Sequence, residues 1–391
     1  MILSLKPSRR FWHQLHRWAG VALAAPFLML GLSGAILAFS RPLDVALHPA
    51  LFTPSGPERL VSVDQVLELA QTETQSVPVT SVQAPDETAP VWIVGLGALH
   101  SHHPGSDMGK TGASGMGGTK TEVFIDPQTG RVLGQRDTAA SALRFLRQLH
   151  ASLVLGEEGR QVVGYIGVTL LLMLISGLVL WWPKPRRFWQ SVIVRKGARG
   201  QRLLLDWHNV LAFWPLSLWL LITLTGVTME FPKTIRAIFD VPAQTAMFRP
   251  MGAGVLPRDA DYPVNGQKAI AIALAVHPDL ALVSVTPAGR DIAVWKIALR
   301  PTGGLATART LVQVDANSGE IMPTEAPSGR WDVWYLGEQR SLHGGALFGL
   351  AGRIVIALSG LAFCGLAGTG VWVFCRRLAI RRAAVMTAVQ T

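Results

Sequence analysis

Four histidines stand beside the four longest apolar stretches of the sequence, and each could supply an imidazole nitrogen to a metal. His16 and His208 each lie near the start of an uncharged run, and His150 and His343 each lie 11 residues before one. A haem iron accepts one axial nitrogen on each face, so two histidines that share one level and face each other can hold it. We therefore take these four side chains as candidate axial ligands of two haems.

The chain around these histidines has the composition of a membrane protein. Of its 391 residues, 49% are hydrophobic and only 16% are charged, which is unusual for a soluble domain. A helix needs about 20 apolar residues to cross a bilayer, and four uncharged runs are long enough. These predicted spans are residues 18–39, 161–182, 207–229 and 354–375.

Basic residues are concentrated in three short segments, which indicates how the chain is oriented. Residues 1–17, 183–202 and 376–391 hold 15 of the 36 Lys and Arg residues and no acidic residue, so 25 acidic residues outnumber the remaining bases. By the positive-inside rule, both termini and the basic loop are cytoplasmic, and the two long segments face the periplasm of a bacterial inner membrane. The placement of the basic residues thus indicates the orientation of the chain in a lipid bilayer, and we expect no nucleic-acid partner.

The sequence repeats itself at an offset near 192 residues. His16 aligns with His208 at an offset of 192, and His150 aligns with His343 at 193. Each half therefore consists of a span, an exported segment and a second span. The neighbouring His13 aligns with a leucine, so we choose His16 as the ligand.

Each exported segment predicts a short helix followed by antiparallel strands. In the first, Ser62 and Gln65 form a capping box that opens a helix to Ala70. An Asp-Pro-Gln-Thr-Gly turn at 126–130 joins two strands. The predicted strands are 79–82, 91–95, 122–125 and 131–133, then 280–286, 292–299 and 310–314 after a second helix at 267–276. The predicted fold is a membrane protein with an all-α four-helix transmembrane bundle and two small α+β periplasmic domains, related by internal duplication.

These patterns divide the chain into eight consecutive segments. They are the cytoplasmic N-terminus with the first span (1–40), the first periplasmic domain (41–140), a histidine helix with the second span (141–183), the basic cytoplasmic loop (184–206), the third span (207–231), the second periplasmic domain (232–335), a histidine segment with the fourth span (336–375) and the cytoplasmic tail (376–391).

The topology decides which histidines can share a haem. His16 and His208 lie at the cytoplasmic ends of their spans, and His150 and His343 at the outer ends. A span of about 22 residues puts roughly 30 Å between these levels, so we pair 16 with 208 and 150 with 343. Two alternatives are open for the outer pair: straight helices would carry it about 16 Å beyond the apolar runs, whereas the glycines at 156–159 and 344–352 would fold the helices back.

Four arginines follow the duplication beside the outer pair. Arg147 aligns with Arg340, and Arg160 aligns with Arg353. An arginine can bind a carboxylate through two parallel hydrogen bonds, so these residues are candidates to bind haem propionates. The alternative is that they are anchors at the lipid interface.

Two further segments have alternative interpretations. Residues 100–118 are rich in Gly, His and Met without a fixed ligand spacing, and we expect a flexible insertion rather than a metal site. Trp331, Trp334 and Tyr335 precede the fourth span and form either an aromatic belt at the interface or a platform for a bulky substrate. The sequence has no Rossmann glycine fingerprint and no cysteine cluster, so a partner must deliver any reductant.

The motifs together resemble one family of membrane proteins. Residues 15–20 read Leu-His-Arg-Trp-Ala-Gly, and residues 177–183 read Gly-Leu-Val-Leu-Trp-Trp-Pro. With the turn at 126–130, they make the chain similar to the PepSY-associated transmembrane family over nearly its whole length, and within it to iron-regulated, FoxB-like siderophore reductases. The resemblance implies PepSY-like exported domains, two haem b groups between the spans, and a ferric siderophore of the hydroxamate type as substrate.

The predicted function is a dihaem b-type inner-membrane cytochrome. It would take electrons from a cytoplasmic donor or from quinol and reduce ferric siderophores in the periplasm, an oxidoreductase activity that releases Fe(II) for uptake. Two other functions remain open: a membrane anchor whose PepSY domains bind a peptide or a protease, and a transporter for iron or a siderophore. Only the first function requires paired haems.

Overall fold

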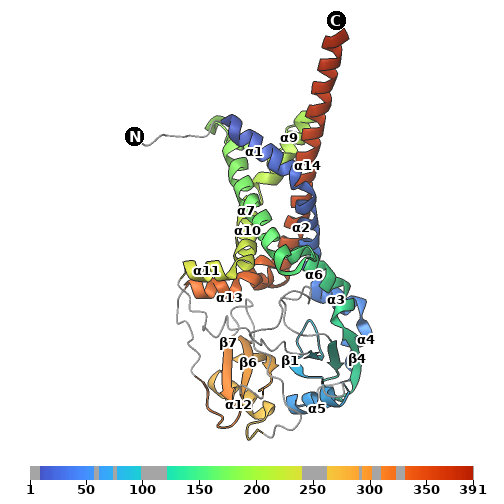
Figure 1. Ribbon diagram of the computed structural model, residues 1–391, viewed down its shortest axis with the longest axis vertical. Coiled ribbons are helices and arrows are strands. Elements are labelled where there is room, and N and C mark those ends of the chain that lie inside the picture. The colour runs from blue at the N-terminus through green and yellow to red at the C-terminus, as the bar shows by residue number, and fades with distance from the viewer. Residues whose placement is uncertain are drawn as a thin grey trace, which may run out of the picture.

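The computed structural model describes residues 9–56, 61–73, 77–97, 121–239, 262–289, 293–301, 310–322 and 331–390. A bundle of long helices forms one part of the molecule, and a β-sheet with short helices forms the other (Figure 1). We call the end of the bundle beside the sheet the sheet end, and the opposite end, where α14 terminates, the distal end. The expected insertion at 100–118 lies outside the described residues.

Two long helices run through the bundle, and two bent pairs of helices pack against them. The long helices, α7 (Gly156–Trp181) and α14 (Gly349–Gln390), are each long and apolar enough to cross a membrane. The bent pairs are α1 (Arg9–Ala22) with α2 (Ala24–Leu37), at 63°, and α9 (Gly200–Phe213) with α10 (Leu216–Glu230), at 61°. The described chain therefore has two candidate spans, or four if each bent pair is one span.

A proline accounts for each bend. Pro26 lies in the first turn of α2, and Pro215 directly precedes α10. A proline nitrogen carries no hydrogen for the carbonyl four residues earlier, and its ring crowds that carbonyl. The first and third apolar runs are therefore broken helices, a feature that the sequence prediction of four spans did not include.

The bends let each half of the chain contact both long helices. Helix α1 packs mainly against α7, whereas α2 packs against α14. In the second half, α9 packs against α14, and α10 packs against α7. In each half, the first helix of the bent pair packs mainly against the long helix of its own half, and the second packs against the long helix of the other half. This equivalence is what the duplication predicts.

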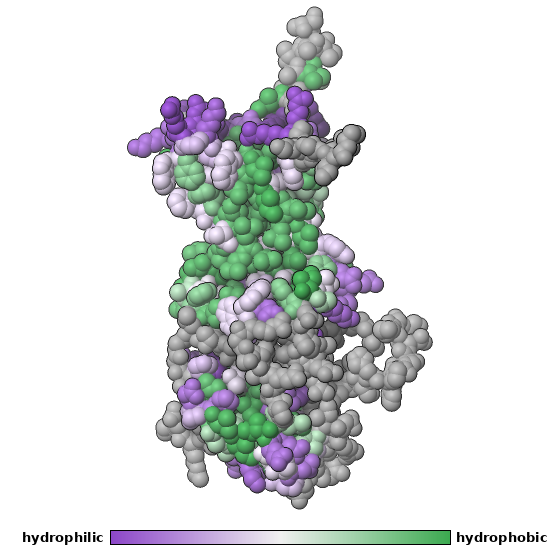
Figure 2. Space-filling model, turned by 90° about the vertical axis from the view of Figure 1, so that its left-hand side faces the viewer, coloured by the Kyte–Doolittle hydropathy of each residue, from purple (hydrophilic) through white to green (hydrophobic). Residues whose placement is uncertain are grey.

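The surface of the bundle is apolar between its two ends. Figure 2 shows hydrophobic side chains over the helices, with hydrophilic residues at the distal end. Large apolar side chains on α7 and α14 are exposed, among them Leu172, Ile175, Leu358 and Leu361. Exposed apolar surface of this extent is typical of a membrane-embedded bundle.

The strands form one antiparallel seven-stranded sheet in the order β4-β3-β2-β1-β5-β6-β7. They are β1 (Val79–Gln83), β2 (Trp92–Leu96), β3 (Thr121–Ile125), β4 (Val132–Asp137), β5 (Leu280–Thr286), β6 (Val294–Pro301) and β7 (Thr310–Asp315). Each half supplies its strands where the sequence predicts them, but β1 pairs with β5, with Val82 opposite Val285. The expectation of two separate domains is corrected: they share one sheet.

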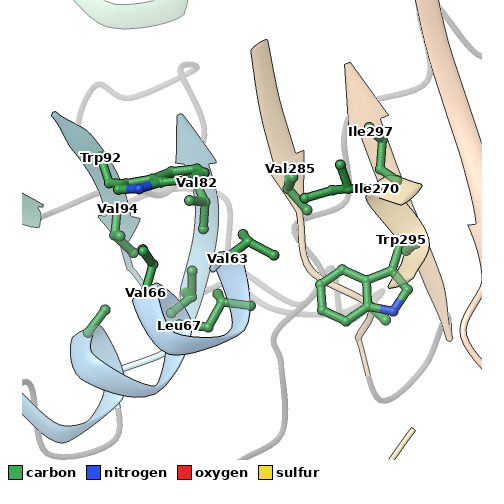
Figure 3. Close-up of a cluster of buried hydrophobic side chains, with 14 of the residues drawn as sticks. Val63, Val66, Leu67, Val82, Trp92, Val94, Ile270, Val285, Trp295 and Ile297 are labelled. Atoms are coloured by element: carbon green, nitrogen blue, oxygen red, sulfur yellow. The ribbon is translucent and has the colours of Figure 1, made fainter. Parts of the chain in front are cut away.

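Helices α5 (Val63–Glu73) and α12 (Gly266–Val276) lie on the sheet and share one core. Figure 3 shows Val66 and Val82 of the first half in the same cluster as Ile270 and Trp295 of the second. Full burial of such side chains contributes about 1.5–3 kcal/mol each. The predicted capping box opens α5, because the Ser62 backbone N–H donates to Gln65 Oε1 (3.0 Å) and the Gln65 N–H to Ser62 Oγ (3.3 Å).

Short helices connect these parts. They are α3 (Ser40–Leu47), α4 (Pro49–Phe52), α6 (Ala142–Ser152), α8 (Phe188–Ser191), α11 (Pro232–Ile238) and α13 (Trp331–His343), with 3₁₀ turns η1 (Thr138–Ala140), η2 (Pro185–Arg187) and η3 (Ala346–Phe348). Asp44 on α3 forms an ion pair with Arg136 on β4 (2.6 Å), which ties the segment after the first apolar run to the sheet.

Asp64 joins the two halves, and its removal is expected to destabilise the sheet part. Its carboxylate accepts the backbone N–H groups of Gly266 (2.8 Å) and Gln267 (3.1 Å) at the start of α12. Losing such a cap costs about 0.5–2 kcal/mol, so Asp64→Ala should lower the unfolding temperature measured in detergent. Glu68→Ala removes an exposed carboxylate one turn later on α5 and should leave that temperature unchanged. Equal unfolding temperatures for the two variants would contradict this role.

Candidate functional site

The helices that carry His150 and His343 fold back onto the bundle. After α6 the chain reverses through Leu153 and Val154, which have φ of 52° and 63° and lead directly into α7. After α13 it reverses through Gly345, with φ of 71°, into η3 and α14. Left-handed residues of this kind end a helix and turn the chain. Of the two sequence alternatives, the structure therefore has the folded-back arrangement.

Glycines allow this close return in both halves. A Cβ atom on Gly159 would overlap the carbonyl oxygen of Ser152, and one on Gly352 would overlap the carbonyl oxygen of Gly345. Each contact joins residues seven apart, and the two contacts are related by the offset of 193 residues. Both histidine helices are therefore held by equivalent backbone contacts.

Each of the four histidines is held by a hydroxyl group on another helix. The contacts made by Nδ1 are His16 to Ser176 Oγ (3.0 Å), His208 to Thr369 Oγ1 (3.2 Å), His150 to Ser33 Oγ (2.8 Å) and His343 to Thr225 Oγ1 (3.1 Å). A glycine follows each hydroxyl residue, and a Cβ there would lie 3.1–3.3 Å from the imidazole Cε1. These glycines are 177, 370, 34 and 226. Each Ser/Thr-Gly pair therefore forms a seat for one imidazole.

The hydrogen bonds of these hydroxyls assign the tautomer of the histidines. Each hydroxyl donates its only hydrogen to a carbonyl of its own helix, at 2.6–3.0 Å. Its oxygen must then accept a hydrogen from Nδ1 of the imidazole. At His343, Nδ1 also contacts the carbonyl oxygen of Ile222 (2.9 Å), which can only accept. In a neutral imidazole, Nε2 is consequently left with the lone pair that binds a metal.

The Ser/Thr-Gly pairs were not predicted from the sequence, although the sequence carries a clear signal for them. Ser33 and Thr225 are 192 residues apart, and Ser176 and Thr369 are 193 apart. These are the offsets of the histidines themselves. A hydroxyl residue followed by glycine in every apolar run, at the period of the duplication, was sufficient to find them.

The imidazoles come together in the two pairs expected from the sequence. The rings of His150 and His343, the sheet-proximal pair, have centroids 6.2 Å apart. His16 and His208, the sheet-distal pair, line one cavity of about 410 Å³, within the usual size range of cofactor pockets. Each pair thus offers two Nε2 lone pairs to one metal ion.

Burial disfavours the charged form of both imidazoles of the sheet-proximal pair. Burial lowers the pKa of His150 to about 4, and the neighbouring imidazole of His343 adds to this shift. Burial also lowers the pKa of His343. Both side chains are thus in the form that coordinates a metal through nitrogen.

The two pairs are closer together than the roughly 30 Å expected from the length of a span. Gly31 of α2 packs on Gly360 of α14, and these helices run in opposite directions (Figure 1). Ser33 therefore lies level with about residue 358, eleven residues or roughly 16 Å from Thr369. The contact between α7 and α10 gives about 10 Å by the same reasoning. The expected separation of roughly 30 Å is therefore wrong. The hydroxyl residues that hold the imidazoles lie inside the spans and not at their ends.

The arginines named as propionate partners have different surroundings. Arg160 forms an ion pair with Glu230 (3.1 Å) and donates to the Met229 carbonyl oxygen (3.2 Å), so its guanidinium is already engaged. Arg147 and Arg340 are exposed, each three residues before a histidine of the sheet-proximal pair, and Arg353 is half-buried on α14. For these three the propionate role stays a prediction.

Several other sequence candidates lie near the two pairs. His13 is exposed at the edge of the cavity, and its Nε2 lies 3.5 Å from Nη1 of Arg377, whereas His16 one turn later contacts a hydroxyl seat. The Tyr335 hydroxyl contacts Thr228 Oγ1 (2.9 Å), and Trp331 and Trp334 are exposed on α13. Among the described residues, no three His, Cys, Asp or Glu side chains form a site for a bare metal ion.

Comparison with known proteins assigns the family. The model of the PepSY-associated TM region matches residues 13–377, which include all four histidines and their hydroxyl seats. The chain belongs to the PepSY-associated transmembrane family. It is also 38% identical over 86 residues to an uncharacterized protein of Pseudomonas aeruginosa. That alignment covers 22% of this chain and 21% of the relative, so the chain matches only about a fifth of the relative's length. As a PepSY-associated membrane protein, the chain carries its histidine pairs within a helical bundle beside a sheet.

Proposed function

We propose that the protein is a dihaem b-type cytochrome of the inner membrane that reduces ferric siderophores in the periplasm. The observation that carries this proposal is the fourfold repetition of one arrangement, in which a Ser or Thr hydroxyl accepts from Nδ1 and leaves Nε2 as a ligand. Polar residues in membrane segments are costly and are usually retained for function. Four equivalent seats, two at each level, therefore support two bis-histidine sites.

The residues present fit a haem at each pair. The donor set is two neutral imidazoles, and each imidazole is oriented by a second hydrogen bond, as is usual for metal-ligating histidines. At the sheet-distal pair, apolar side chains such as Phe27, Leu174 and Phe363 line the cavity, which suits a porphyrin face. When bound, haem would supply reversible one-electron transfer with a potential set by its ligands and surroundings.

The arrangement of the molecule supports electron transfer between two sides of the membrane. The sheet-distal pair would take electrons from a cytoplasmic donor or from quinol, and the sheet-proximal pair would pass them to the substrate. Electron transfer to a ferric chelate needs no acid or base from the protein. Reduction to Fe(II) weakens coordination by hard oxygen ligands, so a hydroxamate siderophore would release its iron.

Access from the periplasm fits the sheet-proximal pair better than the other pair. With the basic distal end in the cytoplasm, the sheet would lie in the periplasm beside His150 and His343. The exposed Trp331 and Trp334 on α13, the helix that ends at His343, would offer a hydrophobic platform to a bulky ligand. A transporter or a peptide-binding anchor has no need of four oriented imidazoles.

An absorption spectrum of the purified protein tests this proposal. After expression with ample haem, we expect the reduced form to show the bands of low-spin b-type haem and to lose them on oxidation. A colourless protein from the same expression would contradict the proposal and favour the anchor or the transporter.

Removing the hydroxyl seats should weaken haem binding without abolishing it. Ser176→Ala and Ser33→Ala free the imidazoles of His16 and His150, and the loss of such a second hydrogen bond typically reduces metal affinity about 10- to 100-fold. Haem transfer to an excess of a haem-scavenging protein measures this loss. Ser359→Ala is the matched control, because this buried hydroxyl bonds only to Ile356 of its own helix among the described residues. Equal rates in Ser176→Ala and Ser359→Ala would contradict the role of the seats.

A further inference from the structure

The cavity of the sheet-distal pair has a cationic side. Besides His16 and His208, its lining includes the guanidinium residues Arg17 and Arg377 and the imidazole of His13. No acidic side chain lines it among the described residues. Arg17 directly follows His16 on α1, and Arg377 lies eight residues, about two turns, after Thr369 on α14. Both arginines are therefore fixed by the helices that build the site.

Arg17 has a donor that lacks a partner. Its Nε is buried and has no hydrogen-bond acceptor among the described residues. The rest of the guanidinium is held, because Nη2 donates to Gln14 Oε1 and the group lies 5.1 Å from the ring centre of Trp18 and 6.0 Å from that of Phe374. A buried donor without an acceptor is costly. A bound anionic group in the cavity would remove this cost.

The duplication shows that the basic groups of α1 are not repeated on its counterpart α9. At the offset of 192 residues, His13 corresponds to Leu205 and Arg17 to Asn209. Leu205 and Asn209 also line the cavity. Equivalent positions thus face the same space, and only those of the first half carry basic groups. A ligand of the cavity would therefore place its negative charge toward α1 and α14.

We infer that Arg17 and Arg377 form a carboxylate-binding site for the two propionates of the haem held by His16 and His208. This inference rests on the proposed function. His13 would orient Arg377 through the contact between its Nε2 and Nη1 (3.5 Å). Arginine binds carboxylates by charge-assisted, often paired hydrogen bonds. The site would fix which side of the cavity the propionate edge of the porphyrin faces, namely that of α1 and α14.

Substitution of either arginine tests this assignment in the full-length haem-loaded protein. Arg17→Gln and Arg377→Gln remove the charge but keep a polar side chain. We expect the haem of the sheet-distal pair to transfer to apomyoglobin roughly 10- to 100-fold faster, because a hydrogen bond to a charged group is worth about 1.5–3 kcal/mol. Arg376→Gln is the matched control, since this exposed neighbour on α14 is not part of the cavity lining.

A second probe separates binding of the propionates from a structural role of the arginines. In protein reconstituted with haem dimethyl ester, the carboxylates are blocked, so Arg17→Gln and Arg377→Gln should lose haem at the wild-type rate. Faster loss of the ester as well would overturn the assignment, as would a rate equal to that of Arg376→Gln with natural haem. Wild-type protein that takes up no haem would instead overturn the proposed function, and the inference with it.

Discussion

His16→Ala and His208→Ala are each expected to remove one haem and leave the other in place. Each variant loses one of two axial ligands of the sheet-distal site, so any haem left on the opposite imidazole would no longer be six-coordinate and low-spin and would bind more weakly. His150→Ala and His343→Ala should remove the other haem by the same reasoning. The measurement is the haem content per chain, with the absorption bands of the remaining haem identifying which site is empty.

His13→Ala is the control for this series. It removes an imidazole from the same helix one turn earlier, where the side chain is exposed and contacts Arg377 rather than a hydroxyl seat. The haem content should stay at that of the wild type, because all four axial histidines are retained; the lost contact with Arg377 should change only the rate at which the haem of the sheet-distal pair transfers out. Loss of a haem from His13→Ala with full retention in His16→Ala would show that the ligand lies one turn away from the residue chosen by the duplication.

Reduced protein is expected to be reoxidised by a ferric hydroxamate siderophore, with Fe(II) appearing in a ferrozine trap. A siderophore is too large to enter the bundle, but the sheet-proximal pair lies where the bundle meets the sheet. His150→Ala and His343→Ala should abolish the reaction, because they remove the haem nearest the substrate. His277→Ala removes a histidine from the sheet part, at the end of α12, and should leave the rate unchanged.

The direction of transfer gives this prediction a second readout. In sealed vesicles, His16→Ala should stop electrons that arrive from the cytoplasmic side, yet spare transfer from a haem that is reduced directly at the sheet-proximal site. A reduced wild-type protein that keeps its spectrum in excess ferric siderophore would contradict the reductase activity. The same result would not contradict the two haem sites, and it would indicate that the protein passes electrons to a periplasmic acceptor other than a ferric siderophore.

Periodicity at the scale of the whole chain could be predicted from the sequence. The offsets of 192 and 193 residues related the four histidines, chose His16 over His13 and gave the pairs that the structure brings together. The strands and the capping box at Ser62 were also found, because alternation and capping are local signals. These features depend on residues close in sequence or on exact repetition.

The features that were missed depend on contacts between distant segments. Pro26 lies inside an apolar run, where prolines are tolerated in membrane helices, so the bend was not evident. The pairing of β1 with β5 joins segments about 200 residues apart, and no local pattern records it. The sequence did not decide whether α6 folds back onto α7, because the glycines at 156 and 159 permit a reversal of the chain but do not require one. Ser33 and Ser176 look like ordinary small residues until the imidazoles that they hold are placed.

The most direct test of the central claim is the haem stoichiometry of the wild-type chain, measured by the pyridine haemochrome assay after haem-replete expression. Four imidazoles in two pairs, each with Nε2 free to coordinate, predict two haem b groups per chain, both low-spin. A value near two that falls to one in His16→Ala and to one in His150→Ala would agree with two independent sites. A wild-type value well below one haem per chain would contradict the account, because the four oriented histidines would then coordinate no haem iron.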